Sequence, residues 1–254
     1  MLLISKPLLS KPKVNMLQLR QWFATANGQR LLGCERHMVQ QQFARCFGSY
    51  ALFYNALDDA PYVSHIRHQI KIGHAGLSPD AHCAERHWPI QPGSIDIVVL
   101  QHSLEFARSA HDVLREAAQA VRPGGHILIT GVSPYSTFAL GRWLSKSPWR
   151  QSHCLSARRV SEWLAVLGFH IEECQFSGYR PLRFLRDADS TSFIERFMHK
   201  KQWPVGNCYM LVARKMMQGS SLQPKRKATF EKLMPLPAAS ASRSGTLEKN
   251  KHND

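Results

Sequence analysis

The sequence predicts a doubly wound α/β fold, in which helices cover both faces of a mostly parallel sheet. Residues Ile95–Leu100 read I-D-I-V-V-L, and a nearly continuous apolar, β-branched run is typical of a strand that is buried on both faces. A helical pattern from His111 to Val121 and a short apolar strand, Ile127–Thr130, follow this run. Strand, helix and strand in this order form a βαβ unit with a right-handed crossover.

Composition supports one folded α/β domain and excludes wholesale disorder. The chain has 254 residues, of which 44% are hydrophobic and 9% aromatic, enough to bury a core. No apolar run approaches the roughly 18 residues of a membrane-spanning helix. The apolar start is broken at Lys6, Pro7 and Lys11, so no secretory signal peptide is expected. We therefore expect a cytoplasmic protein.

The net charge of +15 is concentrated at the two ends of the chain. Residues 1–33 contain five basic and no acidic residues, and residues 214–254 contain nine basic and three acidic ones. We divide the chain into a basic N-terminal extension (residues 1–16), a folded domain (17–215) and a disordered basic tail (216–254). Such ends can attract nucleic acid. The alternative is a tail that only keeps the protein soluble.

The first part of the domain is expected to be mainly helical. Apolar residues between Gln29 and Phe43 recur at spacings of three, four and seven, which predicts an amphipathic helix. Trp22 and Phe23 indicate a shorter helix before it. The segment Phe43–Phe47 is interpreted as the end of a short strand that stops at Gly48.

Later segments continue the α/β pattern. Alternating apolar residues predict a strand within Val63–Ile72, and Ser156 is a suitable N-cap for a helix that ends at Gly168. Strands are expected at Phe169–Cys174 and Cys208–Ala213. The six cysteines are widely scattered with no C-x-x-C pair, so we predict reduced thiols and no metal site.

Two segments resemble class I S-adenosylmethionine (SAM)-dependent methyltransferases of the type 11 group. They read P-I-Q-P-G-S-I-D-I-V-V-L-Q-H-S-L-E-F and L-R-E-A-A-Q-A-V-R-P-G-G-H-I-L-I-T-G, and the resemblance extends over about Cys83–Phe169. It implies a Rossmann-like, seven-stranded sheet with one antiparallel strand near its edge. It also implies SAM as cofactor and methyl transfer to an acceptor, either a small molecule or nucleic acid.

The resemblance also suggests where the cofactor lies. Family members have a glycine-rich loop after their first strand, and C-F-G-S-Y is the candidate here, with one glycine. An Asp-Ala pair beside the adenine corresponds to Cys83-Ala84, and no acid in Val63–Gly73 takes the place of the usual ribose-binding carboxylate. The candidate cofactor-binding residues are Phe47, Gly48, Ser49, Cys83, Ala84, Glu85, Gln101 and His102.

Individual polar residues allow more than one role. His102 lies just beyond the 95–100 strand, where it could contact SAM or act as a general base, or be a structural histidine. Asp96 is expected to anchor the sheet, and Glu105 to face solvent or cap a helix. Ser133, Pro134 and Tyr135 are interpreted as a loop at the mouth of the substrate site.

The departures from the family pattern leave a second function open. A protein with this fold that no longer methylates could serve as a binding or scaffold module with a basic, nucleic-acid-attracting tail.

Overall fold

The computed structural model describes residues 16–55, 66–73, 79–136, 138–139, 148–179 and 206–217. The chain divides into two units, Met1–Leu222 and Gln223–Asp254, and all described residues belong to the first. Most of the predicted N-terminal extension and the tail from residue 218 onward lie outside the described residues. The proposed attraction of nucleic acid to these ends therefore stays a prediction.

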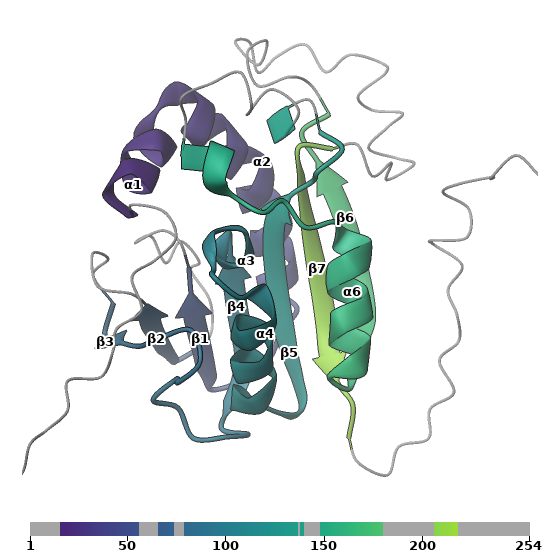
Figure 1. Cartoon of the computed structure of the whole chain (residues 1–254). Coiled ribbons are helices and arrows are strands. Elements are labelled where there is room, and N and C mark those ends of the chain that lie inside the picture. Colours follow the sequence, from purple (N-terminus) through teal and green to yellow (C-terminus); the bar gives the residue numbers. More distant parts are fainter. Residues whose placement is uncertain are drawn as a thin grey trace, which may run out of the picture. The chain divides into compact units, whose positions relative to one another are not determined.

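The fold is built on one seven-stranded sheet with the order β3-β2-β1-β4-β5-β7-β6 (Figure 1). The first five strands in this order are parallel, and β7 runs antiparallel to both of its neighbours. This confirms the predicted doubly wound, mostly parallel sheet. The strand bounds are β1 Tyr50–Tyr54, β2 His68–Gly73, β3 Ala81–His82, β4 Ile95–Gln101, β5 Val121–Val132, β6 Phe169–Ser177 and β7 Cys208–Lys215.

Helices cover both faces of the sheet, and each face packs its own core. Figure 1 shows α4 and α6 in front of the sheet and α2 behind it. Alternate residues of a strand point to opposite faces, so Leu52 and Val98 pack in the cluster with α4 and α6, whereas Phe53 and Val99 pack in the cluster with α1 and α2. The bounds are α1 Met16–Ala24, α2 Ala26–Phe43, α3 Ser103–Phe106, α4 Ala110–Ala120, α6 Ala157–Val166 and the 3₁₀ helix η2 Pro148–Gln151.

Most predicted elements are confirmed, and one is wrong. Ser156 caps α6 by accepting a hydrogen bond from the Arg159 backbone N–H (3.3 Å). The segment Phe43–Phe47 is not a strand, because Phe43 is the last residue of α2 and packs its ring into the core. Strand β1 begins only at Tyr50. The apolar residues before Gly48 therefore belong to the end of a helical stripe and the turn after it.

Asp96 fastens the amino-terminal edge of the sheet, as predicted for an anchor. Its carboxylate accepts backbone hydrogen bonds from Ser49 (2.8 Å) and Tyr50 (2.9 Å), and it pairs with Arg122 (2.5 Å). Gly48 lies so close that an added Cβ would come within 2.3 Å of the Asp96 Cβ. Asp96 thus joins the starts of β1, β4 and β5.

We expect Asp96→Ala to lower the free energy of unfolding by about 2–4 kcal/mol, because three partners lose one shared, nearly buried carboxylate. Urea denaturation followed by circular dichroism measures the loss. Asp112→Ala is the control, since its pair with Arg86 is exposed on the arginine side and its removal should cost about 1 kcal/mol or less. Equal losses in the two variants would contradict the anchoring role.

Candidate functional site

The carboxyl ends of β1 and β4 meet at the point where the strand order reverses. From β1 the chain adds β2 and β3 on one side, then crosses to place β4 and β5 on the other. In open α/β sheets, ligands bind in the crevice outside the carboxyl ends at such a point. Asn55 directly follows β1, and its side-chain oxygen accepts a hydrogen bond from the Gln101 N–H at the end of β4 (3.2 Å). The fold therefore favours a ligand site near Gln101.

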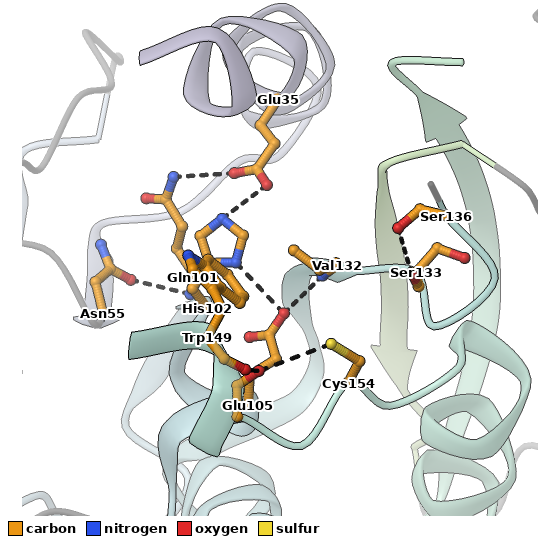
Figure 2. Close-up of polar contacts among 11 residues, drawn as sticks. Glu35, Asn55, Gln101, His102, Glu105, Val132, Ser133, Ser136, Trp149 and Cys154 are labelled. Carbon is orange, nitrogen blue, oxygen red and sulfur yellow. Dashed lines mark hydrogen bonds and ion pairs between the residues drawn. The ribbon is translucent and has the colours of Figure 1, made fainter. Parts of the chain in front are cut away.

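A buried cluster of three charged residues, Glu35, His102 and Glu105, lies at this edge (Figure 2). Glu35 comes from α2, His102 follows β4, and Glu105 belongs to α3. The His102 Nε2 is 2.8 Å from the Glu35 Oε1, and its Nδ1 is 3.4 Å from the Glu105 Oε1. Both ring nitrogens thus face a carboxylate.

The two carboxylates also hold other groups at the edge. The Gln101 Nε2 donates to the Glu35 Oε2 (3.3 Å), and the Val132 backbone N–H donates to the Glu105 Oε1 (2.6 Å). A Cβ at position 131 would lie 2.8 Å from the Tyr209 hydroxyl and 3.0 Å from the Glu105 Oε1. Gly131 is therefore needed for the close approach of these side chains. The cluster ties α2, the end of β4 and the end of β5 together.

His102 has an unusual backbone conformation. With φ 52° and ψ 15°, it is the one described non-glycine residue with a positive φ. Histidine tolerates this left-handed region better than most residues, although at a cost. The contacts of its ring with Glu35 and Glu105 hold it there. The bend turns the chain from β4 directly into α3.

The electrostatics of the cluster favour a protonated imidazole. Complete burial by itself lowers the pKa of His102, but the nearby carboxylates of Glu35 and Glu105 outweigh it and raise this pKa to about 10. At neutral pH the ring therefore carries a proton on each nitrogen. A ring in this state cannot accept a proton from a reacting group.

Aromatic rings enclose His102. Its ring centroid lies 5.2 Å from that of Phe23 on α1 and 5.5 Å from that of Trp149 on η2. Trp149 also contacts Trp22, Phe106 and Phe138. His102 and Trp149 are completely buried. The charged cluster thus lies in an environment from which bulk water is excluded.

Several buried polar atoms around the cluster lack a hydrogen-bond partner. Among the described residues, all such side-chain atoms except the Trp88 nitrogen lie at this edge or belong to the ion pair of Glu35 with His102. Buried polar groups are normally satisfied, so each exception calls for an explanation. They are Gln101 Oε1, Ser103 Oγ, Glu105 Oε2, Thr130 Oγ1 and Trp149 Nε1.

The structure places Cys83 and Ala84 at the same edge of the sheet, directly after β3. Burial and the nearby Glu116 raise the pKa of the Cys83 thiol to about 12, although its hydrogen bond with Gly73 opposes this, so the thiol is neutral. Glu85 is nearly buried, and its carboxylate accepts hydrogen bonds from the backbone N–H groups of Arg108 and Ser109. Glu85 therefore fixes the segment that starts α4.

The prediction that Phe47, Gly48 and Ser49 form the loop after the first strand is wrong. These residues precede β1 and lie at its amino end, beside Asp96. The loop after β1 begins at Asn55, and residues 55–67 contain no glycine. Most of that loop, residues 56–65, lies outside the described residues.

Ser133, Pro134 and Tyr135 follow β5 at the carboxyl edge, the edge that also carries the charged cluster. The Ser136 hydroxyl donates to the Ser133 carbonyl (2.7 Å) and fixes a tight turn. Tyr135 is 63% exposed at the tip of this turn. This position agrees with the interpretation as a loop at the mouth of a site, which itself stays a prediction.

Sequence reasoning missed Glu35 and assigned Glu105 incorrectly. Glu35 lies on the apolar stripe of α2 with Leu31, Met38 and Val39, and a lone acid on such a stripe is a signal that could have identified it. Glu105 neither faces solvent nor only caps a helix, since it is 1% exposed and accepts the Val132 N–H.

No group of three His, Cys, Asp or Glu side chains within the described ranges is arranged to hold a metal ion. All six cysteines are described, and none forms a disulfide. None of the helices that the structure describes is long and apolar enough to cross a bilayer.

Comparisons of the sequence found a similarity to one family model and to one curated protein. Residues 39–129 match the family model of the type 11 methyltransferase domain. The chain is also 27% identical over 109 residues to the uncharacterized protein YafS of Escherichia coli strain K12. This alignment covers 42% of the present chain and 45% of YafS, so it spans less than half the length of that relative.

Solved structures share the fold. A SAM-dependent methyltransferase from Archaeoglobus fulgidus has a TM-score of 0.52 and 13% identity, with 78% of this chain and 99% of that chain covered. A SAM-dependent methyltransferase from Thermotoga maritima has a TM-score of 0.51 and 12% identity, with 71% and 89% covered. At these identities the likeness shows the fold, which agrees with the strand order.

The protonated state of His102 predicts how stability depends on pH. A histidine whose pKa is raised by folding stabilises the folded state. This stabilisation is complete below the pKa of the unfolded chain, about 6.5, and is lost as the pH rises toward the folded pKa of about 10. We expect the free energy of unfolding, measured with urea, to fall by about 2 kcal/mol between pH 6.5 and 8.5. In His102→Gln this dependence should largely disappear. An equal slope in the variant would contradict the assignment.

Proposed function

We propose that this protein is a SAM-dependent methyltransferase, because residues 39–129 match the family model of the type 11 methyltransferase domain and solved SAM-dependent methyltransferases share its fold. The cofactor lies outside the carboxyl ends of β1 and β4. One observation carries the proposal: the polar residues Asn55, Gln101 and His102 lie at the ends of β1 and β4, where the strand order reverses.

The chemistry of these residues suits the methionine end of SAM. The unpartnered oxygens of Gln101 and Glu105 are acceptors, and the surrounding cluster has two carboxylates for one imidazolium. Such a set favours a ligand that carries donors and positive charge over an anionic one. SAM offers an ammonium and a sulfonium there, which together outweigh its single carboxylate. Cys83 and Ala84, at the end of β3, are assigned to the adenine side.

When bound, SAM supplies an electrophilic methyl group on a positively charged sulfur. The chain then has to align the acceptor with that methyl group and keep water away. Gln101 and Asn55 orient the cofactor at the ends of β4 and β1. The ring wall of Phe23, Phe106 and Trp149 keeps the edge dry.

His102 has a positioning role in this proposal. It holds a proton at both ring nitrogens and keeps the end of β4 in its left-handed bend. Proton transfer from an acceptor, where one is needed, falls to another group or to water. The exposed ring of Tyr135, on the neighbouring turn after β5, lies on the side assigned to the acceptor, whether a small molecule or nucleic acid.

One observation favours the second candidate, a binding or scaffold module that no longer methylates. The loop after β1 lacks the glycines that allow a backbone to approach a nucleoside closely. A measurement of cofactor binding distinguishes the two candidate functions.

We expect isothermal titration of the purified chain with SAM to give saturable heat, together with an upward shift in melting temperature. Gln101→Met keeps the shape of the side chain but removes both polar atoms, so it should weaken binding about tenfold or more. Gln175→Met, on the edge strand β6, is the matched control and should bind normally. The absence of heat and of any thermal shift with both SAM and S-adenosylhomocysteine would overturn the proposal.

A further inference from the structure

The charges in the Glu35–His102–Glu105 cluster do not balance. One imidazolium lies between two carboxylates, which leaves one negative charge. Within the described part of the chain, no lysine or arginine pairs with Glu35 or Glu105. The other groups that donate hydrogen bonds to the two carboxylates, the Gln101 amide and the Val132 N–H, are neutral.

Burial makes this remaining charge effective. The side chains of Glu35 and His102 are completely buried, and that of Glu105 is 2% exposed. Water screens such a charge only weakly, so its field reaches further than that of a surface carboxylate. An uncompensated buried charge is also costly. A positive group that binds beside the carboxyl ends of β1 and β4 would therefore be stabilised.

The cluster also contains buried acceptor atoms that lack a hydrogen-bond donor. The Gln101 amide donates to Glu35, which leaves its Oε1 buried without a donor, and the Glu105 Oε2 also lacks one. Both unpartnered atoms are acceptors. They lie at the end of β4 and on α3, beside the strand-order reversal. Because the Trp149 Nε1 donor and the hydroxyls of Ser103 and Thr130 also lack partners, it is the excess negative charge that points to a cationic ligand.

We propose that Glu35, together with Glu105, selects the cofactor by its charge, so that the protein distinguishes the sulfonium of SAM from the neutral thioether of S-adenosylhomocysteine. This inference rests on the proposed function and adds a specificity determinant to it. The cluster acts through its field and needs no direct contact with the ligand. Loss of the positive charge on methyl transfer weakens the hold of the protein on its product.

The test compares three ligands by isothermal titration with the full chain. SAM carries a sulfonium, sinefungin carries an amine-bearing carbon in its place and is also cationic, and S-adenosylhomocysteine is neutral at this position. We expect Glu35→Gln to weaken the binding of both cationic ligands about tenfold, the size expected for one charge about 12 Å from the ligand at an effective dielectric constant of about 20. Binding of S-adenosylhomocysteine should change less than about twofold.

Glu173→Gln is the matched control. Glu173 contacts Gln42, near the end of α2, and Arg45, just after α2, and both follow Glu35 by seven or more residues. The same change of charge there should leave all three affinities unaltered. A uniform loss for all three ligands in Glu35→Gln, or no loss for any, would overturn the proposal.

Two further measurements keep the proposal testable if Glu35→Gln does not fold. Glu105→Gln removes the other carboxylate and should show the same selective loss. The unmodified protein should bind SAM and sinefungin more tightly than S-adenosylhomocysteine, and the reverse order would contradict charge selection without any variant. If none of the three ligands binds the unmodified protein, the proposed function itself fails. If all bind without charge preference, only the present inference fails.

Discussion

The pairing of one buried histidine with two glutamates is the constraint on which the carboxyl edge of the sheet depends. Glu35 reaches it from α2, His102 from the end of β4 and Glu105 from α3. Removing His102 would leave two buried carboxylates without their cation, which costs more than the pairing itself contributes. The cluster therefore fixes where α2 lies over the edge and how the chain leaves β4.

The two ends of the strands, the amino edge and the carboxyl edge of the sheet, are built differently. At the amino edge, Asp96 satisfies the N–H groups of Ser49 and Tyr50 and pairs with Arg122. At the carboxyl edge, buried polar atoms lack partners and His102 has a strained backbone. Local departures from the rules of stable packing concentrate at functional sites. The proposed cofactor site therefore lies at the less satisfied of the two edges.

Hydrophobic period and helix caps were enough to predict the α/β class and most elements, and the family resemblance implied the seven-stranded sheet, but the site needed contacts between distant segments. The run I-D-I-V-V-L and the Ser156 cap identified β4 and α6 because their signals are local. The first strand was misplaced because Phe43 ends a helical stripe, whereas β1 starts after Gly48 and is followed by a loop without glycine. The pairing of Glu35 with His102 spans 67 positions, and no local pattern encodes it.

The charge state of His102 is the most direct test of the cluster. Long-range nitrogen–proton correlation NMR on the ¹⁵N-labelled full chain reports whether each ring nitrogen is protonated, and His102→Gln assigns the signal. Because burial alone would lower the pKa of His102 whereas Glu35 and Glu105 raise it to about 10, we predict two protonated ring nitrogens at pH 7.5. A neutral tautomer at that pH, with one nitrogen unprotonated, would contradict the account.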